Sequence, residues 1–473
     1  MVGKYLYINT IGCQMNVYDS EQIAMRLTGL GYELTSSLEK ADLVIVNTCT
    51  IRAKAEQKAF SFLGRLARLK KKKPGLISGV GGCVAQQEGE KIFRRIPYLD
   101  LVFGTQAIDR LPQLVQKIEQ KRCRVVDIEQ ADQPLFQEAD DRMAAADQVS
   151  RFVTIMRGCD NFCSYCVVPY VRGRETSRHP DDIINEIRQY AKTGLKEVTL
   201  LGQNVNSYGT KERLCSFTEL LWRVSQIEQL LRIRFTTSHP KDFGRDLISA
   251  FQTNEKLCKH IHLPVQSGSN RVLKRMNRKY TKELYLDKVA KLRDTCPDIA
   301  ITSDIIVGFP GESTADFDET LELIRMIEFD GLFAFQYSDR PNAPAADFEG
   351  KISDQQKRDR LQILLDLQET LTLKKNRALV GTCLPILAEG LSKRQSSGNL
   401  NQPDQAVQWT GRTSTNKIVN FYQDRHPASC NDMCPGQLVN VKIEKAYSHS
   451  LWGKPVEVKA LPEGLKGERS YAA

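Results

Sequence analysis

Short apolar runs alternate with helical patterns over the first quarter of the chain. The runs YLYIN, DLVIV and LISGV have the length of buried strands, and helical periodicity follows the first two at about 18–30 and 53–70. Alternation of this kind is typical of βα units that build a parallel sheet. The pattern therefore predicts an α/β domain over residues 1–127.

A second alternation begins after residue 150 and contains six candidate strands. Helical patterns at 181–192, 281–294 and 314–328 lie between strands, and a long helix over about 354–378 follows the last strand. Six repeats predict an open (β/α)6-type barrel over residues 151–378, rather than the closed eight-stranded form. The candidate strands are Phe152–Met156, Glu197–Leu201, Arg232–Thr236, His260–Pro264, Ile299–Ile306 and Leu332–Phe335.

The remaining segments differ in pattern. Residues 128–150 carry six acids against one arginine, which indicates an acidic linker. From residue 379 the chain turns to short strands, such as ILAEG, Thr415–Phe421 and Gln437–Glu444, separated by Gly, Asn and Pro. We expect a small antiparallel β-barrel over 379–459 and a disordered tail over 460–473.

Composition narrows the class of protein. The chain has 473 residues, of which 41% are hydrophobic and 26% charged, as in ordinary soluble proteins. No apolar run approaches the ~20 residues of a membrane span, and the N-terminus enters a strand pattern without a signal segment. We therefore expect a cytoplasmic protein with no membrane contact. The net charge of +10 favours a polyanionic partner.

Thirteen cysteines in a cytoplasmic chain predict metal ligands and buried thiols rather than disulfides. Cys159, Cys163 and Cys166 lie on one loop after the first barrel strand. Three thiolates can hold three irons of a 4Fe–4S cluster, and with no fourth cysteine nearby one iron stays open for a ligand. Structural zinc is the alternative, but closed zinc sites prefer four ligands. The loop, RGCDNFCSYC, resembles the cluster loop of the radical S-adenosylmethionine (SAM) superfamily.

That resemblance implies that SAM binds the open iron and is cleaved to a 5′-deoxyadenosyl radical. The residues that contact SAM are expected at the C-terminal rim of the barrel, where (β/α) barrels have their active sites. The segment Val307–Glu312 is similar to the superfamily's segment that packs on the SAM adenine. The candidate SAM-binding residues are Tyr165, Gln203, Asn204, Gln266, Asp304, Val307 and Gly308.

Another cysteine triad, Cys13, Cys49 and Cys83, precedes this one in the chain and follows the ends of three predicted strands at spacings of 36 and 34 residues. The carboxyl ends of parallel strands meet at one edge of a sheet, so these thiols are expected to converge. Three unrelated buried thiols are the alternative. Equivalent positions in successive βα repeats favour a second 4Fe–4S cluster with an open iron.

Both triads belong to motifs that together resemble the methylthiotransferase family of radical SAM enzymes over essentially the whole chain. The matching motifs are TIGCQMNVYDSE, NTCTIRAKAEQK, GGCVAQ, MRGCDNFCSYCVVPYVRGRE, LLGQNVNSYG, HLPVQSGS and TSDIIVGFPGE. The third domain, with GRTSTNKIVNF, looks like an RNA-binding TRAM barrel. Within the family, GCQMN and GQNVNSY are closest to the MiaB branch.

By resemblance, the substrate is tRNA carrying N6-isopentenyladenosine next to the anticodon, and the product is its 2-methylthio derivative. SAM then has two roles: it is the methyl donor to a sulfur at the cluster of Cys13, Cys49 and Cys83, and the radical source at the cluster of Cys159, Cys163 and Cys166. Two other branches stay open: one acts on threonylcarbamoyl-adenosine in tRNA and one on an aspartate of a ribosomal protein. A non-enzymatic iron–sulfur carrier or sensor would need complete four-cysteine ligation, which neither triad supplies.

The remaining expectations concern partners and individual side chains. An electron donor and a sulfur or iron–sulfur supply protein are expected, and we expect the chain to act as a monomer. Arg412 and Lys417 are candidate RNA contacts. The run Lys70–Lys73 is either a solvated helix end or a phosphate contact, and Arg172 and Arg174 are candidate anion contacts. Cys430 and Cys434 make a poor metal site without further ligands.

Overall fold

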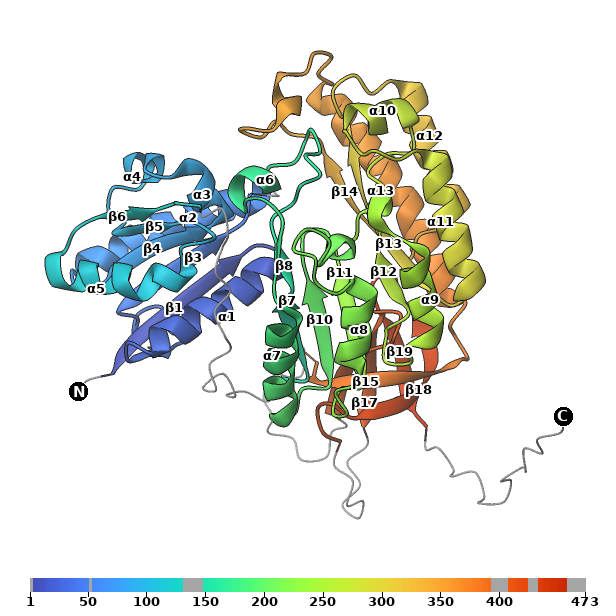
Figure 1. Cartoon of the computed structure of the whole chain (residues 1–473), viewed down its shortest axis with the longest axis horizontal. Helices are drawn as coiled ribbons and strands as arrows, with labels where there is room; N and C mark the ends of the chain where they lie inside the picture. Colours follow the sequence, from blue (N-terminus) through green and yellow to red (C-terminus); the bar gives the residue numbers. More distant parts are fainter. Residues whose placement is uncertain (1–2, 51–52, 131–147, 393–406, 424–432, 457–473) are drawn as a thin grey trace. The chain divides into compact units, whose positions relative to one another are not determined.

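The computed structural model describes residues 3–50, 53–130, 148–392, 407–423 and 433–456 (Figure 1). Contacts divide the chain into two compact units, Met1–Thr372 and Leu373–Ala473. The division falls inside a long helix, α13 (Asp354–Arg377). The domain boundary expected at 378/379 remains a prediction, as do the limits of the linker and tail, which fall largely outside the described residues.

A six-stranded parallel sheet opens the first unit, in the order β2-β1-β3-β4-β5-β6. The strands are β1 (Lys4–Ile11), β2 (Tyr32–Leu34), β3 (Leu43–Thr48), β4 (Ile77–Gly82), β5 (Leu101–Phe103) and β6 (Val125–Asp127). The three central strands match the apolar runs in the sequence. β2, β5 and β6 were not predicted, because three residues are too few to show a strand period.

Helices cover both faces of this sheet. On one face, Ile23 and Leu27 of α1 (Gln14–Thr28) and Val115 of α5 (Leu111–Lys121) pack on the strands. On the other face, α2 (Ala53–Lys72) and α4 (Lys91–Arg95) contribute Leu63, Leu66 and Ile92. Burial on both faces explains why the first four residues of β3, Leu43 to Val46, are all apolar rather than alternating.

Six of the strands that follow form two three-stranded parallel sheets, ordered β11-β10-β7 and β12-β13-β14. An isolated bridge between Ile233 and Leu257 connects β11 to the segment before β12. Among the described residues no pairing joins β7 to β14, so the arc is open, which confirms the predicted barrel class. The strands are β7 (Ser150–Thr154), β10 (Glu197–Leu201), β11 (Arg232–Thr236), β12 (His260–His262), β13 (Ala300–Val307) and β14 (Gly331–Gln336).

Helices alternate with these strands and begin at capping residues visible in the sequence. Ser216, Thr281 and Ser313 each accept a hydrogen bond from a backbone N–H in the first turn of their helices. Such caps satisfy donors that the helix itself leaves unpaired. The main helices are α7 (Pro180–Lys192), α8 (Phe217–Ser225), α9 (Arg245–Thr253), α10 (Asn270–Arg275), α11 (Lys282–Thr295) and α12 (Thr314–Ile327).

The second unit contains a closed five-stranded barrel, β15-β16-β17-β19-β18, around Ile386, Phe421 and Val441. Four pairings are antiparallel, as predicted, but β17 and β19 pair in parallel. A closed ring with an odd number of strands cannot alternate direction throughout, so one pairing must be parallel. The strands are β15 (Cys383–Leu391), β16 (Val407–Arg412), β17 (Ile418–Gln423), β18 (Leu438–Ala446) and β19 (Leu451–Pro455). None of the described helices is long and apolar enough to cross a membrane.

Candidate functional site

The first cysteine triad lies at one edge of the N-terminal sheet. Cys13 precedes α1 directly after β1, Cys49 follows β3, and Cys83 opens α3 (Cys83–Glu88) after β4. These three strands are neighbours, and the Cys49 thiol forms hydrogen bonds with both Cys13 and Cys83. The structure therefore brings the three thiols together.

Asn16 is the polar centre of this edge and was not among the predicted site residues. Its Oδ1 accepts hydrogen bonds from the backbone N of Cys13 at 3.2 Å and from the thiol at 3.4 Å. Its Nδ2 donates to Asn47 Oδ1 at 3.0 Å and to the carbonyl of Thr48 at 3.1 Å. Fully buried, Asn16 thus fixes the turn that carries Cys13 to the strand that carries Cys49. The only sequence signal for it is its place in GCQMN.

The backbone before Cys83 requires glycine. Gly82 has φ +88°, and a Cβ there would lie 2.4 Å from the carbonyl oxygen of Thr48. Both the left-handed conformation and the close approach exclude a side chain. Glycine at this position lets β4 end directly beside the Cys49 loop.

Two of these thiols have lowered pKa values. The hydrogen bond with Cys49 and the charge of Arg172 lower the pKa of Cys13 to about 6, against the opposing effect of burial. The same two influences lower the pKa of Cys83 to about 7. Cys49 is shifted in the opposite direction, because its pKa is raised by its thiol neighbours and by burial. Thiolate is the form that binds metal, so this edge favours iron ligation.

The second triad lies on the loop between β8 (Met156–Arg157) and α6 (Val168–Val171). The Cys159 backbone N donates to the carbonyl of Gly173 at 3.3 Å, and the Cys166 N donates to that of Cys163 at 2.9 Å. Burial raises the pKa of Cys159 to about 11 and of Cys166 to about 12. The thiols of Cys159 and Cys166 are therefore protonated without a metal, and ligation would release their protons.

The two triads are connected through α6. Val167, next to Cys166, and Val171 at the end of α6 pack in one cluster with Cys83. Arg172 then forms a buried ion pair with Asp19 of α1, at 2.8 Å. Arg172, a candidate anion contact, is thus paired with a carboxylate of this chain. Arg174 is exposed and lies 3.5 Å from Asp160.

Tyr165 and the Val307–Glu312 segment meet behind the second triad. Tyr165 packs with Phe309 and Ile306 in one apolar cluster. Gly308 has φ +70°, and its N–H donates to Glu312 Oε2 at 2.9 Å. Glu312 in turn accepts a hydrogen bond from Arg360 at 2.7 Å. These bonds fix a turn at the end of β13, beside buried Val307.

The other predicted residues at the barrel rim differ in how far other side chains of the chain already bind them. Asn204 is fully engaged, since its amide contacts Ser207 and Asp242 and accepts from the N–H of His239. Asp304 lies 3.4 Å from His262 Nε2. The backbone of Gln266 has φ +73° and pairs with β13, which places its buried side chain at the rim.

Several buried polar atoms at the ends of β10 and β11 have no hydrogen-bond partner. They are Gln203 Oε1, both amide atoms of Asn206, Ser238 Oγ and His239 Nε2. Burial lowers the pKa of His239 to about 2, so its ring is neutral. Buried groups of this kind normally find partners, which indicates that a polar ligand completes them.

The cysteine sets suit clusters better than single metal ions. Among the described residues, no three His, Cys, Asp or Glu side chains are grouped to hold one metal ion. A cluster binds each thiolate to a different iron, so its ligands stand farther apart than those of one ion. Three thiolates with an open fourth position match the chemistry of a substrate- or cofactor-binding cluster.

The remaining predicted contacts lie elsewhere. Arg412 forms an ion pair with Glu389 at 3.0 Å, and Lys417 lies beyond the following turn. Lys70 pairs with Asp100 and Lys73 with Asp42, so these members of the basic run are engaged within the sheet domain. Cys434 is exposed, and Cys430 lies outside the described residues.

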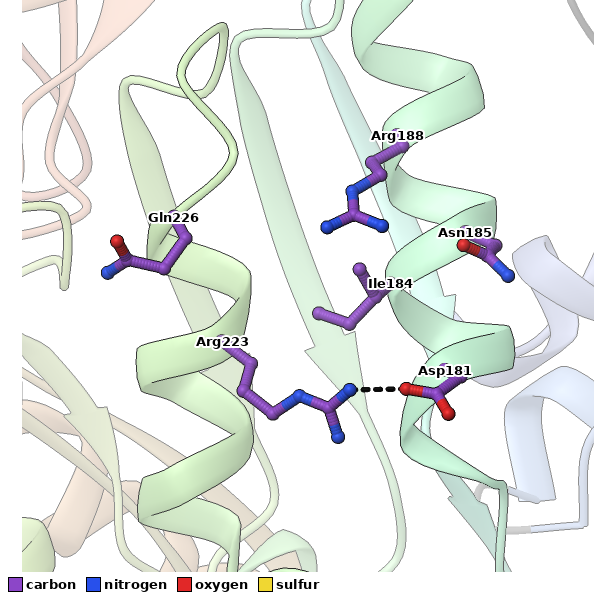
Figure 2. A pocket seen from close by; sticks show the side chains of 6 residues that line it. All are labelled: Asp181, Ile184, Asn185, Arg188, Arg223 and Gln226. Atoms are coloured by element: carbon purple, nitrogen blue, oxygen red, sulfur yellow. Dashed lines mark hydrogen bonds and ion pairs between the residues drawn. The ribbon is translucent and has the colours of Figure 1, made fainter.

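A surface pocket lies away from both triads, on the outer side of the barrel between α7 and α8 (Figure 2). An ion pair between Asp181 and Arg223 crosses it. Its lining contains no cysteine and none of the predicted site residues. Side chains at the strand ends, rather than this pocket, define the candidate site.

Comparison with known proteins agrees with this geometry. Residues 5–104 match the family described as Uncharacterized protein family UPF0004, and residues 153–324 match the Radical SAM superfamily. The chain resembles the structure of the radical SAM methyltransferase TsrM from Kitasatospora setae, with cobalamin and a [4Fe-4S] cluster bound, at a TM-score of 0.53. That match has 13% identity and covers 73% of this chain and 77% of TsrM, so it shows the fold alone.

Curated relatives match almost the entire chain. The tRNA-2-methylthio-N(6)-dimethylallyladenosine synthase of Desulfosudis oleivorans is 54% identical over 96% of this chain and 97% of its own. The protein of the same name from Syntrophus aciditrophicus is 52% identical over 95% of this chain and 94% of its own. This chain belongs to the family of tRNA-2-methylthio-N(6)-dimethylallyladenosine synthases, which confirms the resemblance drawn from its cysteine motifs.

Proposed function

We propose that this chain is a radical SAM methylthiotransferase that acts on tRNA. It converts N6-isopentenyladenosine (N6-dimethylallyladenosine) next to the anticodon into the 2-methylthio derivative. The observation that carries this proposal is the packing of Cys83 against Val167 and Val171, which connects two incomplete cysteine triads through one short helix. Two sites with open coordination, placed together, suit a reaction that needs both a radical and a sulfur donor.

The enzyme works with two 4Fe–4S clusters and SAM. We assign one cluster to the triad Cys13, Cys49 and Cys83, and the other to the triad Cys159, Cys163 and Cys166. When bound, these groups supply the reductive cleavage of SAM and the methylthio sulfur. The chain itself binds and orients the clusters and SAM, and it keeps water out of the site, as proteins around such cofactors generally do.

We assign the SAM site to the barrel rim beside the second triad. We assign its apolar and backbone wall to Tyr165, Val307 and Gly308, because Tyr165 packs in one cluster with Ile306 and Phe309, the residues that flank Val307 and Gly308 in the chain. Gln203 and Gln266 supply polar contacts, and the unpartnered amide of Asn206 extends this polar surface. Asp304 lies on the same rim. Asn204 acts indirectly, by fixing the loop after β10 through Asp242 and the His239 N–H.

The barrel of the second unit is assigned to RNA binding, with Arg412 and Lys417 as phosphate contacts. Both flank the Thr413–Asn416 turn at the end of β16, and the chain as a whole carries a net charge of +10. An adenine in an anticodon loop is suited to such an enzyme, since unstacked loop bases can be splayed into a pocket.

The partners and the cellular location that we propose follow from these cofactors and this substrate. A low-potential electron donor reduces the clusters, and a sulfur or iron–sulfur supply protein replaces the sulfur that each turnover removes. The chain acts as a monomer in the cytoplasm, where its tRNA substrate is found.

Substrate choice is tested with three tRNA preparations under anaerobic conditions. The reconstituted protein, SAM and dithionite are incubated with isopentenylated tRNA, unmodified tRNA or threonylcarbamoylated tRNA, and nucleosides are analysed by mass spectrometry. We expect 2-methylthio product from isopentenylated tRNA alone. Product from the threonylcarbamoylated tRNA, with none from the isopentenylated one, would contradict the proposal.

A further inference from the structure

Arg278 is a buried arginine that is neither a proposed cluster ligand nor one of the residues assigned to SAM or RNA binding. It lies in the turn between α10 and α11, between two residues of positive φ, Asn277 at +58° and Lys279 at +60°. Only 4% of the residue is exposed. This turn places the guanidinium of Arg278 against the second cysteine loop.

The guanidinium contacts the second triad directly. Its Nη1 donates to Cys163 Sγ at 3.4 Å and to the Tyr165 hydroxyl at 3.4 Å. Its Nη2 donates to the carbonyl of Pro264 at 2.8 Å, and its Nε donates to the Tyr280 hydroxyl at 2.9 Å. Arg278 therefore joins a proposed cluster ligand to the end of β12.

The charge of Arg278 lacks a carboxylate counter-ion. Across the described residues, no Asp or Glu lies within ion-pair distance of it, whereas the buried Arg172 and Arg178 each have one. An arginine stays protonated in proteins, and burying an unpaired charge is costly. The groups that Arg278 contacts are two tyrosine hydroxyls, one backbone carbonyl and the sulfur of Cys163. Because a cysteine binds iron as the thiolate, this sulfur is the contacting atom that carries negative charge when the cluster is bound.

We propose that Arg278 is a positioning residue that supplies the counter-charge for the Cys163 thiolate and raises the reduction potential of the cluster held there. This inference rests on the proposed assignment of that cluster. Reduction adds one electron from an external low-potential donor, and no proton needs to move. A fixed positive charge beside a ligand sulfur favours the more negative, reduced form, and hydrogen bonds to cluster sulfurs tune potentials in the same direction.

A purely structural arginine would behave differently. If Arg278 only ties the turn to Pro264 and Tyr280, its replacement lowers stability and leaves the potential unchanged. Arg278→Met and Arg278→Gln both remove the charge, and the glutamine keeps hydrogen-bonding capacity. Arg278→Lys keeps the charge but loses the fork of donors. Lys279→Gln, at the exposed neighbouring position, is the matched loss of one solvated charge.

The test uses the full chain carrying Cys13→Ala, Cys49→Ala and Cys83→Ala, so that one cluster remains. Its potential is measured by an anaerobic redox titration followed by electron paramagnetic resonance. At the midpoint of this parent, we expect Arg278→Met to lower the ratio of reduced to oxidised cluster about tenfold, which is 59 mV for one electron. Arg278→Lys should retain most of the potential, and Lys279→Gln should leave it unchanged.

Each other outcome has a defined meaning. An unchanged potential in Arg278→Met or Arg278→Gln, with the cluster intact, would overturn the inference. If neither uncharged variant retains iron while Arg278→Lys does, the need for the counter-charge is supported; loss of iron in all three would overturn it. Failure of the parent itself to assemble a cluster would instead refute the assignment of Cys159, Cys163 and Cys166.

Discussion

The guanidinium of Arg172 lies 2.8 Å from Oδ2 of Asp19, and both side chains are almost fully buried. Arg172 follows the second cysteine loop, whereas Asp19 belongs to the helix that begins after Cys13. The same guanidinium lowers the pKa of Cys13 and Cys83. One ion pair thus ties the segment after the second triad to the first triad and contributes positive charge there.

Removing Arg172 leaves Asp19 as a buried, uncompensated charge. Breaking a buried pair in this way typically costs about 3–5 kcal/mol. We therefore expect Arg172→Met to lower the free energy of unfolding of the metal-free protein by that amount, measured by urea titration. Arg174→Met is the control, because its exposed pair with Asp160 should contribute less than ~1 kcal/mol. Equal losses in the two variants would show that the buried pair has no special role.

Asn16→Ala should weaken the first cluster site without affecting the second. It removes the acceptor of the Cys13 N–H and a donor to Asn47, and each orphaned buried group costs about 1–3 kcal/mol. We expect lower iron retention after reconstitution, approaching half of the wild-type content, while SAM cleavage persists. Asn185→Ala, on the exposed side of α7, should retain full iron. Normal iron in Asn16→Ala would contradict the role of Asn16 in positioning Cys13.

Glu175 provides a pH-dependent contribution to stability. Burial raises its pKa from 4.5 to about 7. Because the folded state binds this proton more tightly, the contribution is fully present below pH 4.5 and is lost as the pH rises through 7. Glu175→Gln cannot ionise, so its stability relative to wild type should be greater at pH 8.5 than at pH 5.5. Urea midpoints at the two pH values measure this difference, and an identical difference at both would exclude the effect.

The proposed RNA contacts predict a change in salt dependence. Replacing a lysine or arginine that binds a phosphate reduces the slope of log affinity against log salt by about 1. Arg412→Gln and Lys417→Gln should each do so for tRNA binding. Lys454→Gln, on β19 near the opposite end of β17, is the control and should leave the slope unchanged. An unchanged slope in both test variants would remove this turn from the RNA interface.

Much of the architecture could be predicted because its signals are local. Cys13, Cys49 and Cys83 follow consecutive long apolar strands, so parallel-sheet geometry alone predicts their convergence. In the (β/α) barrel, the strands of five residues or more could also be predicted, because their apolar pattern is local. The three-residue strands β2, β5 and β6 carry no such period, and the parallel β17–β19 pairing follows from ring closure rather than from any residue.

The supporting side chains could not be predicted, because their partners are distant in sequence. Arg278 meets Cys163 across 115 positions, and Arg172 meets Asp19 across 153. Neither position differs from an ordinary surface arginine in its local pattern. Asn204 shows what a local signal leaves out: its place at a strand end predicts a ligand contact, and only the fold reveals that its amide also contacts Asp242 and the N–H of His239.

We assign methylthio transfer to the first triad and SAM cleavage to the second, and one anaerobic reaction tests this assignment. The variant with Cys13, Cys49 and Cys83 all replaced by alanine is incubated with SAM, dithionite and isopentenylated tRNA beside the wild-type protein, and nucleosides and small molecules are quantified by mass spectrometry. We predict that the wild type yields 2-methylthio-adenosine product together with 5′-deoxyadenosine, whereas the variant yields 5′-deoxyadenosine alone. Methylthiolated product from the variant would contradict the account.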